Sequence, residues 1–277
     1  MGDAVTGTAV VTGGGRGIGR AIALALAEAG FPVAVLARSR LEVEATCHQI
    51  LERRGEAFAA TCDVRDSEAV IRAVARAEEE LGPTGTLVNN AGTGLALGPL
   101  WTVDPDDWWT DVETTVRGAF NACRAVVPGF VERRSGRIVN VASYVAIRPA
   151  PYQTGYAAGK AALLSMTEAL AASLAPHGVA VFAFTPGFVH TELTRRILET
   201  SAGREWLPEV GTGRVLAPDE GARMVVELAR GRADVLSGRF LHALDDLDDL
   251  LRRIDEIEEC DLYAPRLRRL PARPSAA

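Results

Sequence analysis

Residues 8–29 read TAVVTGGGRGIGRAIALALAEA, and this stretch decides the fold. Residues 8–12 predict a short buried strand, and the alanine-rich segment 20–29 has the apolar periodicity of a helix. The turn between them contains Gly13, Gly17 and Gly19 in the spacing GxxxGxG. Such glycines let the backbone approach a pyrophosphate, whose charge would face the N–H groups that open the helix. The spacing differs from GxGxxG, and a tight turn without a ligand is the alternative interpretation.

The alternation of strand and helix continues along the chain. We expect six further strands, at residues 33–36, 58–62, 86–89, 137–142, 179–185 and 236–243. We expect five further helices, at residues 41–53, 67–81, 106–131, 156–174 and 218–229. This rhythm predicts α/β architecture: a single Rossmann-type domain over residues 1–243, with a doubly wound parallel sheet of about seven strands and helices on both faces. Ligands bind beyond the carboxyl ends of such strands, so the residues after each strand are the candidates for a site.

Composition excludes several classes of protein. The chain has 277 residues, 48% of them hydrophobic, and a formal net charge of −6, which argues against a nucleic-acid partner. No stretch approaches the roughly 20 apolar residues of a membrane span. The cysteines show neither CxxC nor Cys/His spacing, so we expect no disulfide framework, no metal site and a cytoplasmic location. They stand at Cys47, Cys62, Cys123 and Cys260.

The residues after the second strand bear on the choice of nucleotide. NAD-binding folds often place an acidic residue there for the ribose 2′-hydroxyl, but this chain has Ala37 and Arg38. The guanidinium of Arg38, with that of Arg16 in the glycine turn, would suit the 2′-phosphate of NADP. We therefore expect NADP(H) to be preferred, with NAD(H) possible. The alternative is that both arginines are solvated loop residues.

Lys160 is the single lysine of the chain, which has 29 arginines. A lysine has a pKa that shifts readily on burial, whereas an arginine stays protonated, so an amine retained at one position indicates chemistry that needs it. Tyr156 lies four residues earlier, on the same face of the predicted helix. An ammonium group there can stabilise a tyrosinate, and Ser143, after the preceding strand, can donate a hydrogen bond to the same substrate oxygen. The three residues predict an acid–base unit for a carbonyl or alcohol.

With these motifs in order, the sequence resembles the short-chain dehydrogenase/reductase family up to about residue 243. The matching residues are Thr12-Gly13-Gly14-Gly15-Arg16-Gly17-Ile18-Gly19, Asp63-Val64, Asn89-Asn90-Ala91-Gly92, Ser143, Tyr156-Ala157-Ala158-Gly159-Lys160, and Pro186-Gly187 with Thr191. The resemblance implies a homo-oligomer, a dimer or a tetramer formed through the two long helices. Charge and hydropathy, as described above, predict neither a nucleic-acid nor a membrane partner.

The resemblance also implies roles for individual residues. Tyr156 would give or take the proton, Lys160 would lower the pKa of Tyr156 and hold the nicotinamide ribose, and Ser143 would orient the substrate oxygen. The cofactor would contact Gly13, Gly15, Arg16, Gly17, Ile18, Gly19, Arg38, Asp63, Val64, Asn89, Ala91, Gly92, Tyr156, Lys160, Pro186, Gly187, Val189 and Thr191. Within that set Asp63 would meet the adenine, Asn89 the cofactor near the sheet edge, and Val189 and Thr191 the nicotinamide amide.

One position departs from the family's pattern. Many members have an asparagine in the helix before the catalytic strand, in an Asn-x-x-Gly setting that supports a proton-relay water; here the segment reads Thr115-Val116-Arg117-Gly118. Thr115 offers a hydroxyl but no amide. We expect either an altered, rerouted or weakened relay, or a relay in which the threonine or a shifted water does the asparagine's job, since water bridges tolerate varied partners.

The substrate side is less determined by the sequence. The segment 188–216, with the loop 93–101, predicts a pocket with sizeable apolar walls, or a helical flap packed on the domain. Its large apolar residues are Phe188, Leu193, Ile197, Trp206 and Leu207. We also expect Tyr144 and Tyr152 to line the substrate pocket.

The segment 244–277 is an unusual C-terminal extension. Apolar residues recur in it at helical spacing, and residues 244–261 have a net charge of −7. We expect an amphipathic helix that packs on the body or on a neighbouring subunit, because its apolar stripe would otherwise be exposed. A solvated helix is the alternative.

Together these features predict an NADP-dependent oxidoreductase. It would transfer a hydride between nicotinamide and the carbonyl or secondary alcohol of a small to medium, partly apolar substrate. Two alternatives remain open: a nucleotide-binding regulatory protein with a weakened site, motivated by Thr115, and an epimerase or dehydratase on the same fold.

Overall fold

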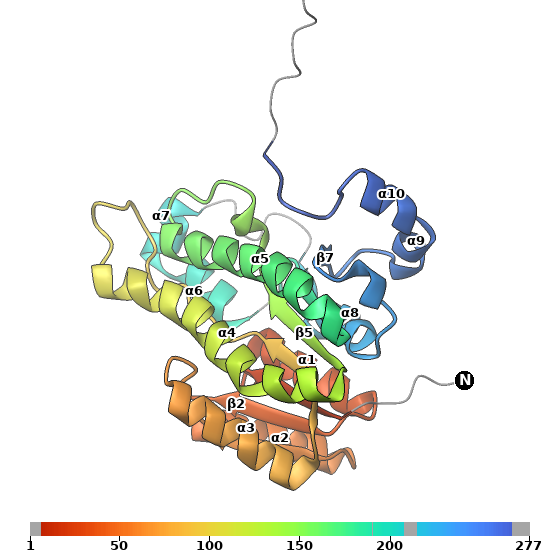
Figure 1. Ribbon diagram of the computed structural model, residues 1–277. Coiled ribbons are helices and arrows are strands. Elements are labelled where there is room, and N and C mark those ends of the chain that lie inside the picture. Colours follow the sequence, from red (N-terminus) through yellow and green to blue (C-terminus); the bar gives the residue numbers. More distant parts are fainter. Residues whose placement is uncertain (1–6, 190, 208–214, 268–277) are drawn as a thin grey trace, which may run out of the picture.

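A computed structural model describes residues 7–189, 191–207 and 215–267. Its centre is one seven-stranded sheet of order β3-β2-β1-β4-β5-β6-β7, with every pair of neighbouring strands parallel (Figure 1). The strands are β1 (Thr8–Thr12), β2 (Val33–Ala37), β3 (Ala57–Thr61), β4 (Thr84–Asn89), β5 (Gly136–Val141), β6 (Val179–Thr185) and β7 (Phe240–His242). The prediction of a single doubly wound parallel sheet is confirmed.

Helices cover both faces of the sheet. On one face lie α1 (Gly17–Glu28), α2 (Arg40–Glu52) and α8 (Pro218–Ala229). On the other lie α3 (Ser67–Leu81), α4 (Pro105–Arg133) and α5 (Thr154–Leu174). The short helices α6 (Glu192–Glu199) and α7 (Ser201–Trp206) follow β6. No helix among the described residues is both long and apolar enough to span a membrane.

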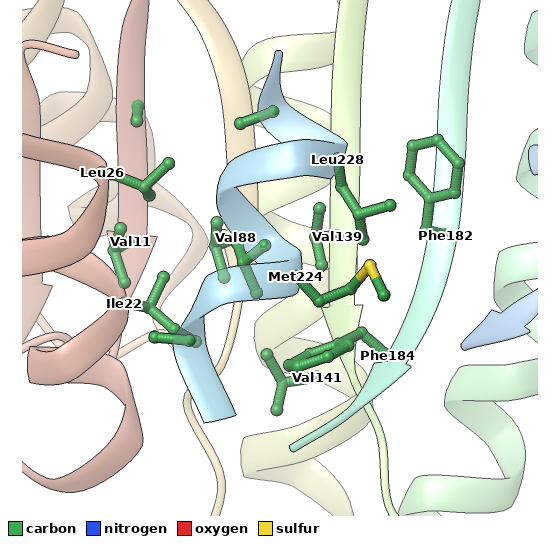
Figure 2. Close-up of a cluster of buried hydrophobic side chains, with 14 of the residues drawn as sticks. Val11, Ile22, Leu26, Val88, Val139, Val141, Phe182, Phe184, Met224 and Leu228 are labelled. Atoms are coloured by element: carbon green, nitrogen blue, oxygen red, sulfur yellow. The ribbon is translucent and has the colours of Figure 1, made fainter. Parts of the chain in front are cut away.

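Strand residues alternate between two hydrophobic cores, because successive side chains of a strand point to opposite faces. Val11 packs with α1 and α8, whereas its neighbour Val10 packs with the helices of the other face. Figure 2 shows the first core, where Ile22 and Leu26 of α1 and Met224 and Leu228 of α8 meet the strands. Because both faces are buried, the strands are nearly continuous apolar runs, which is how the sequence revealed them.

Two elements differ from their predictions. The last strand was expected over residues 236–243, but β7 covers only Phe240–His242, and Asp234–Leu236 form a 3-10 turn. The reason is Gly238, which has φ of +91° and donates its N–H to Val181 O, so the chain turns before it joins the sheet. The extension forms two short helices, α9 (Leu247–Arg252) and α10 (Ile254–Glu259), in place of one helix.

Candidate active site

A cavity of about 710 Å³ lies at the carboxyl edge of the sheet. Eighteen of the predicted site residues line it, drawn from the turns after β1, β2, β3, β4, β5 and β6 and from the starts of α1 and α5. They are Gly13, Gly15, Arg16, Gly17, Ile18, Gly19, Arg38, Asp63, Val64, Ala91, Gly92, Ser143, Tyr156, Lys160, Pro186, Gly187, Val189 and Thr191. Asn89 and Thr115 do not line it.

The glycine turn forms a cradle that side chains would fill. A Cβ at Gly19 would lie 2.2 Å from Gly13 O, and one at Gly13, where φ is +64°, would lie 2.9 Å from Ala91 Cα. Helix α1 opens on this cradle with no side-chain cap and no acidic residue in its first turn. Its first N–H groups are thus available to an anion, which fits the pyrophosphate of a dinucleotide.

Hydrogen bonds join the turn after β1 to the turn after β4. Thr12 Oγ1 accepts from Asn90 N at 3.0 Å and from Ala91 N at 3.2 Å. In return, Asn90 Nδ2 donates to Thr12 O at 3.0 Å and to Gly13 O at 3.1 Å. The two turns are therefore fixed relative to each other, and they hold the cradle open.

At the far end of the cavity, charged side chains surround the position expected for the adenosine ribose. Arg16 Nη1 lies 3.7 Å from Glu42 Oε1 across the cavity wall. Asp63 pairs with Arg65 at 2.7 Å, and its pKa is lowered chiefly by hydrogen bonding from Arg65, with a smaller contribution from the charge of Arg38. The charge of Arg38 is therefore near enough to act on the Asp63 carboxylate. Glu42 is a second carboxylate that lines the cavity, and the sequence analysis did not single it out.

The proposed acid–base residues meet on the opposite wall. Tyr156 and Lys160 are one turn apart on α5, and Lys160 Nζ lies 5.6 Å from the centre of the Tyr156 ring. Lys160 is 4% exposed and donates from Nζ to Val141 O, at the end of β5, at 2.5 Å. Ser143 follows two residues after that carbonyl and lines the same cavity.

Burial sets the pKa values of this group. It raises the pKa of Tyr156 to about 12, with hydrogen bonding to Ser143 acting against the rise and the charge of Asp111 adding to it. It lowers the pKa of Lys160 from 10.5 to about 8. In the protein alone, then, desolvation dominates: the phenol holds its proton at neutral pH, and the amine is easier to deprotonate than a free lysine.

Comparison with known proteins identifies the family. The family model "short chain dehydrogenase" matches residues 7–202. The chain belongs to the short-chain dehydrogenase family. It is therefore an NAD(P)-dependent oxidoreductase of alcohol and carbonyl substrates, and the resemblance seen in the sequence is confirmed.

Individual members of the short-chain dehydrogenase family match nearly end to end. An acetoacetyl-CoA reductase of Shinella zoogloeoides is 38% identical over 236 residues, covering 85% of this chain and 95% of the relative. A short chain dehydrogenase of Pseudocercospora fijiensis is 36% identical and covers 90% of this chain and 84% of the relative. Among solved structures, a variant of the actinorhodin polyketide ketoreductase with NADPH has a TM-score of 0.78 and 33% identity, covering 86% of this chain and 95% of that one.

Asn89 lies behind the cavity wall of this dehydrogenase. Its Nδ2 donates to Asn140 Oδ1 at 2.9 Å, and Asn140 Nδ2 donates to Thr167 Oγ1 at 2.8 Å. This buried chain of amides joins β4 and β5 to α5, the helix of Tyr156, so it holds that helix in register. Its neighbour Asn90 lines the cavity instead. Strand alternation could have separated the two, because adjacent residues at a strand end face opposite ways.

Thr115 also lies behind the wall, close to Lys160. A Cβ at Gly92 would be 3.6 Å from both Thr115 Oγ1 and Lys160 Nζ. Thr115 Oγ1 is buried with no hydrogen-bond partner among the described residues, as are the hydroxyls of Thr93 and Thr114, which line the cavity. Buried hydroxyls without a protein partner are sites for ordered water. A role for Thr115 in the reaction stays a prediction.

Asp111 is a buried group near the site that the sequence analysis missed. It is fully buried on α4, where Oδ1 accepts from Leu95 N at 2.8 Å and Oδ2 from Ala96 N at 3.1 Å. The carboxylate thereby fixes the loop after β4, and Leu95 lines the cavity. No sequence motif marks such a residue, because its partners are backbone groups of a loop.

The aromatic residues of the substrate side pack on one another outside the lined cavity. The rings of Tyr152 and Trp206 have centroids 4.8 Å apart, and Gly98 N donates to Tyr152 O at 2.9 Å. Helix α7 thus packs through Trp206 on the loop of Tyr152, which is itself bonded to the loop of Gly98. The expectation that Tyr144 and Tyr152 line the cavity is not met. Tyr144 turns toward β7 and stacks on His242, with centroids 5.3 Å apart. The side chains of Leu193 and Ile197 lie outside the described residues.

Proposed function

We propose that this dehydrogenase is an NADP-dependent ketoreductase that interconverts a ketone and a secondary alcohol, with Tyr156 as the acid–base group. The observation that supports this most is the position of Ser143, Tyr156 and Lys160 on one wall of the cavity whose other end is the glycine cradle. A carbonyl held between them would face both a proton donor and the nicotinamide end of a dinucleotide.

Each residue of the group has a separate task. In reduction, a hydride from the nicotinamide would add to the carbonyl carbon. Tyr156 would give its phenolic proton to the carbonyl oxygen, and Ser143 would hold that oxygen by a hydrogen bond. Lys160 would supply positive charge beside the phenolate that forms. We include Thr115 as a holder of water, because its hydroxyl, which has no hydrogen-bond partner among the described residues, lies near Lys160.

Tyr156 must be protonated to act as the acid in reduction. Burial raises its pKa to about 12, so the phenol has its proton at neutral pH and can donate it to a carbonyl oxygen. We propose reduction as the direction because relatives are named as reductases. For the substrate we propose a small to medium, partly apolar ketone.

The NADP preference rests on charge at the ribose end. Arg16 and Arg38 are both exposed there, where two guanidinium groups can bind a 2′-phosphate. Glu42 is a carboxylate at this end that would favour a ribose 2′-hydroxyl, but it faces Arg16. NAD(H) remains the second candidate on account of Glu42.

We also propose a homo-oligomer formed through α4 and α5. A cytoplasmic location stays a prediction from cysteine usage, and the boundary of the extension at residue 243 likewise stays a prediction.

The decisive experiment compares the wild type with Tyr156→Phe. We expect NADPH to bind both proteins equally, by fluorescence titration, and turnover of a ketone panel to fall by a factor of about 10²–10⁴ in the variant. Tyr263→Phe, at the protein surface far along the chain, is the matched control and should keep full activity. Unchanged turnover in Tyr156→Phe would overturn the role of Tyr156.

The same assay separates the alternative functions. Following NADPH absorbance with a panel of ketones shows consumption if the protein is a ketoreductase. Tight NADPH binding with no consumption on any ketone would indicate a regulatory protein. Conversion of a substrate with no net change in NADPH would indicate an epimerase or dehydratase.

A further inference from the structure

The extension beyond residue 243 meets the sheet at β7, its last strand (Figure 1). Leu247 and Leu250 of α9 and Ile257 of α10 are at most 7% exposed and belong to the same core as α1 and α8. The extension is therefore packed on the domain as part of its hydrophobic core.

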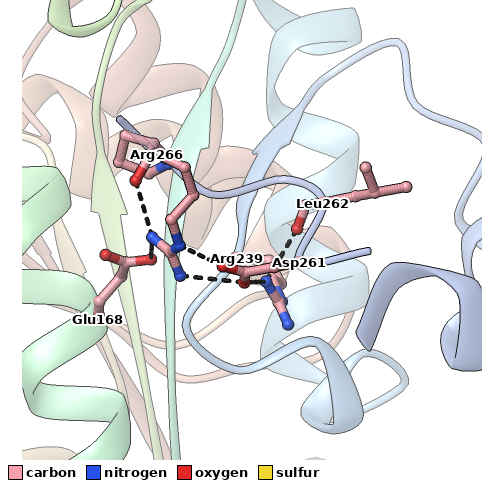
Figure 3. Close-up of polar contacts among 6 residues, drawn as sticks. Glu168, Arg239, Asp261, Leu262 and Arg266 are labelled. Atoms are coloured by element: carbon pink, nitrogen blue, oxygen red, sulfur yellow. Dashed lines mark hydrogen bonds and ion pairs between the residues drawn. The ribbon is translucent and has the colours of Figure 1, made fainter. Parts of the chain in front are cut away.

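Polar contacts anchor the end of the extension as well. Phe240 N, on the free edge of β7, donates to Tyr263 O at 2.7 Å. Arg239 Nη1 donates to Asp261 Oδ1 at 2.7 Å and to Leu262 O at 2.9 Å (Figure 3). Arg266 pairs with Asp261 and reaches Glu168 of α5 at 2.7 Å. Both ends of the described extension are thus tied to β7 and its surroundings.

The first residues of the extension fix the side chain of His242, the last residue of β7. His242 N donates to Asp245 Oδ2 at 2.7 Å, and Leu244 N donates to His242 Nδ1 at 2.9 Å. Because Nδ1 accepts a hydrogen bond, a neutral His242 has its proton on Nε2. The backbone of the extension therefore sets both the orientation and the tautomer of the ring.

The ring of His242 contacts two loops that line the cavity. Its Nε2 would lie 3.1 Å from a Cβ at Gly187, where φ is +75°, so the imidazole packs directly behind the turn after β6. Its face stacks on Tyr144 at 5.3 Å, with an interplanar angle of 28°. Tyr144 adjoins Ser143, and the guanidinium of Arg148 covers its ring at 5.1 Å. One side chain thus lies against the loop of Ser143 and the loop of Gly187.

We propose that His242 is a positioning residue that the C-terminal extension holds against these two loops, so that Ser143 and Gly187 keep a fixed separation. This rests on the proposed function, in which Ser143 orients the substrate oxygen and Gly187 belongs to the nicotinamide end. The extension thereby serves catalysis from outside the cavity. The essential feature is a planar ring that fills the space between Tyr144 and Gly187. The hydrogen bond from Leu244 N to His242 Nδ1 keeps the ring in place.

The test compares three variants of full-length protein. His242→Ala removes the ring and the acceptor, His242→Phe keeps an aromatic ring, and His242→Asn keeps an acceptor near the position of Nδ1. We expect kcat/KM for a ketone to fall about tenfold or more in His242→Ala, chiefly through kcat, while the NADPH dissociation constant changes less than about threefold. His242→Phe should recover most of the loss and His242→Asn less of it. The control is His48→Ala, because the side chain of His48 is 72% exposed on α2, where it pairs with Glu52 at 3.1 Å.

Hydrogen–deuterium exchange gives a readout that needs no turnover. We expect His242→Ala to speed exchange about tenfold or more at residues 143–147 and 185–189, with β1 unchanged, and His242→Phe to restore it. Unchanged exchange and kinetics in His242→Ala would overturn the proposal, as would equal faster exchange in β1, which would indicate general destabilisation. If the wild type reduces no ketone, the proposed function fails, and the exchange data still decide the role of His242.

Discussion

Lys160 is the residue where stability and function oppose each other most directly. It is the single lysine of the chain, 4% exposed, with Val141 O accepting from its Nζ. Placing an ammonium group there is costly, because burial removes its hydration. An apolar side chain would avoid that cost, so a buried amine at this position fits the role proposed for Lys160 beside Tyr156.

The free-energy cost of burying the Lys160 ammonium group can be measured from the pH dependence of unfolding. Below about pH 8 the amine is protonated in both the folded and the unfolded protein. Between about 8 and 10.5 the folded protein releases the proton and the unfolded chain keeps it, so stability rises with pH. We expect the unfolding free energy of the wild type, relative to Lys160→Met, to rise by roughly 3 kcal/mol across this window and to be flat below it. Urea unfolding of both proteins from pH 6.5 to 10.5 checks this. A difference that falls with pH would mean that the site stabilises the cation.

A substitution of Arg38 tests the proposed preference for NADP over NAD. Removing its guanidinium takes away charged hydrogen bonds to a 2′-phosphate, so Arg38→Ala should weaken NADPH binding by about 10- to 100-fold, or roughly 1.5–3 kcal/mol. NADH binding should change less than about twofold, because NADH has no phosphate there. Fluorescence titration with both nucleotides measures the two affinities. Arg72→Ala is the control, because Arg72 is an exposed residue of α3. Tighter binding of NADH than NADPH by the wild type would contradict the preference.

The residues predicted from the sequence are those whose spacing has a chemical reason. The Tyr156–Lys160 pair and the glycines of the first turn were placed by rules of helix geometry and backbone conformation, and the structure brings them to one cavity. Asp111 and His242 were not found, and Asn90 was part of the matching motif but was given no contact with the cofactor. Their contacts are with loop backbone or with distant strand ends, and these become neighbours only once the sheet is assembled.

At the scale of elements, burial on two faces made the inner strands easy to predict, whereas the ends of β7, one of the two edge strands, were predicted wrongly. Strand β6 (Val179–Thr185) is buried at every position and was predicted with its observed ends. Strand β7 is three residues long, and a turn at Gly238 determines where it starts. The extension is a second case in which the type of element was predicted and its ends were not. The spacing of its apolar residues predicted a helix, but the break at Arg253 depends on how α9 and α10 pack on the core.

The packing of the extension predicts a stability effect. Leu250 of α9 is 5% exposed in the core with α1 and α8, so Leu250→Ala should lower the free energy of unfolding by about 2–5 kcal/mol. Leu244, which is 50% exposed, gives the matched control, and Leu244→Ala should cost little. Urea unfolding compares them. Equal small effects would mean that α9 does not pack on the body in solution.

At the scale of the whole molecule, the two faces of the sheet have different outer surfaces. The face with α1, α2 and α8 is partly covered by the extension. On the other face α4 exposes Trp109 and Phe120, which are 58% and 53% exposed and lie eleven residues, or about three turns, apart on one side of the helix. The neighbouring helix α5 exposes mostly alanine and serine, which permit close approach of another helix. This surface suits a second copy of the chain.

Self-association through α4 and α5 can be tested with a single charge. The wild type should sediment at twice the chain mass of 29.4 kDa or more, and Phe120→Glu should shift it toward the monomer, because an unpaired carboxylate would be buried in the interface. Leu41→Glu is the control, since Leu41 is 81% exposed on α2, on the opposite face of the sheet. Analytical ultracentrifugation over a range of concentrations measures all three proteins. A wild-type monomer would contradict self-association, and loss of the oligomer in Leu41→Glu alone would move the interface to the face of α2.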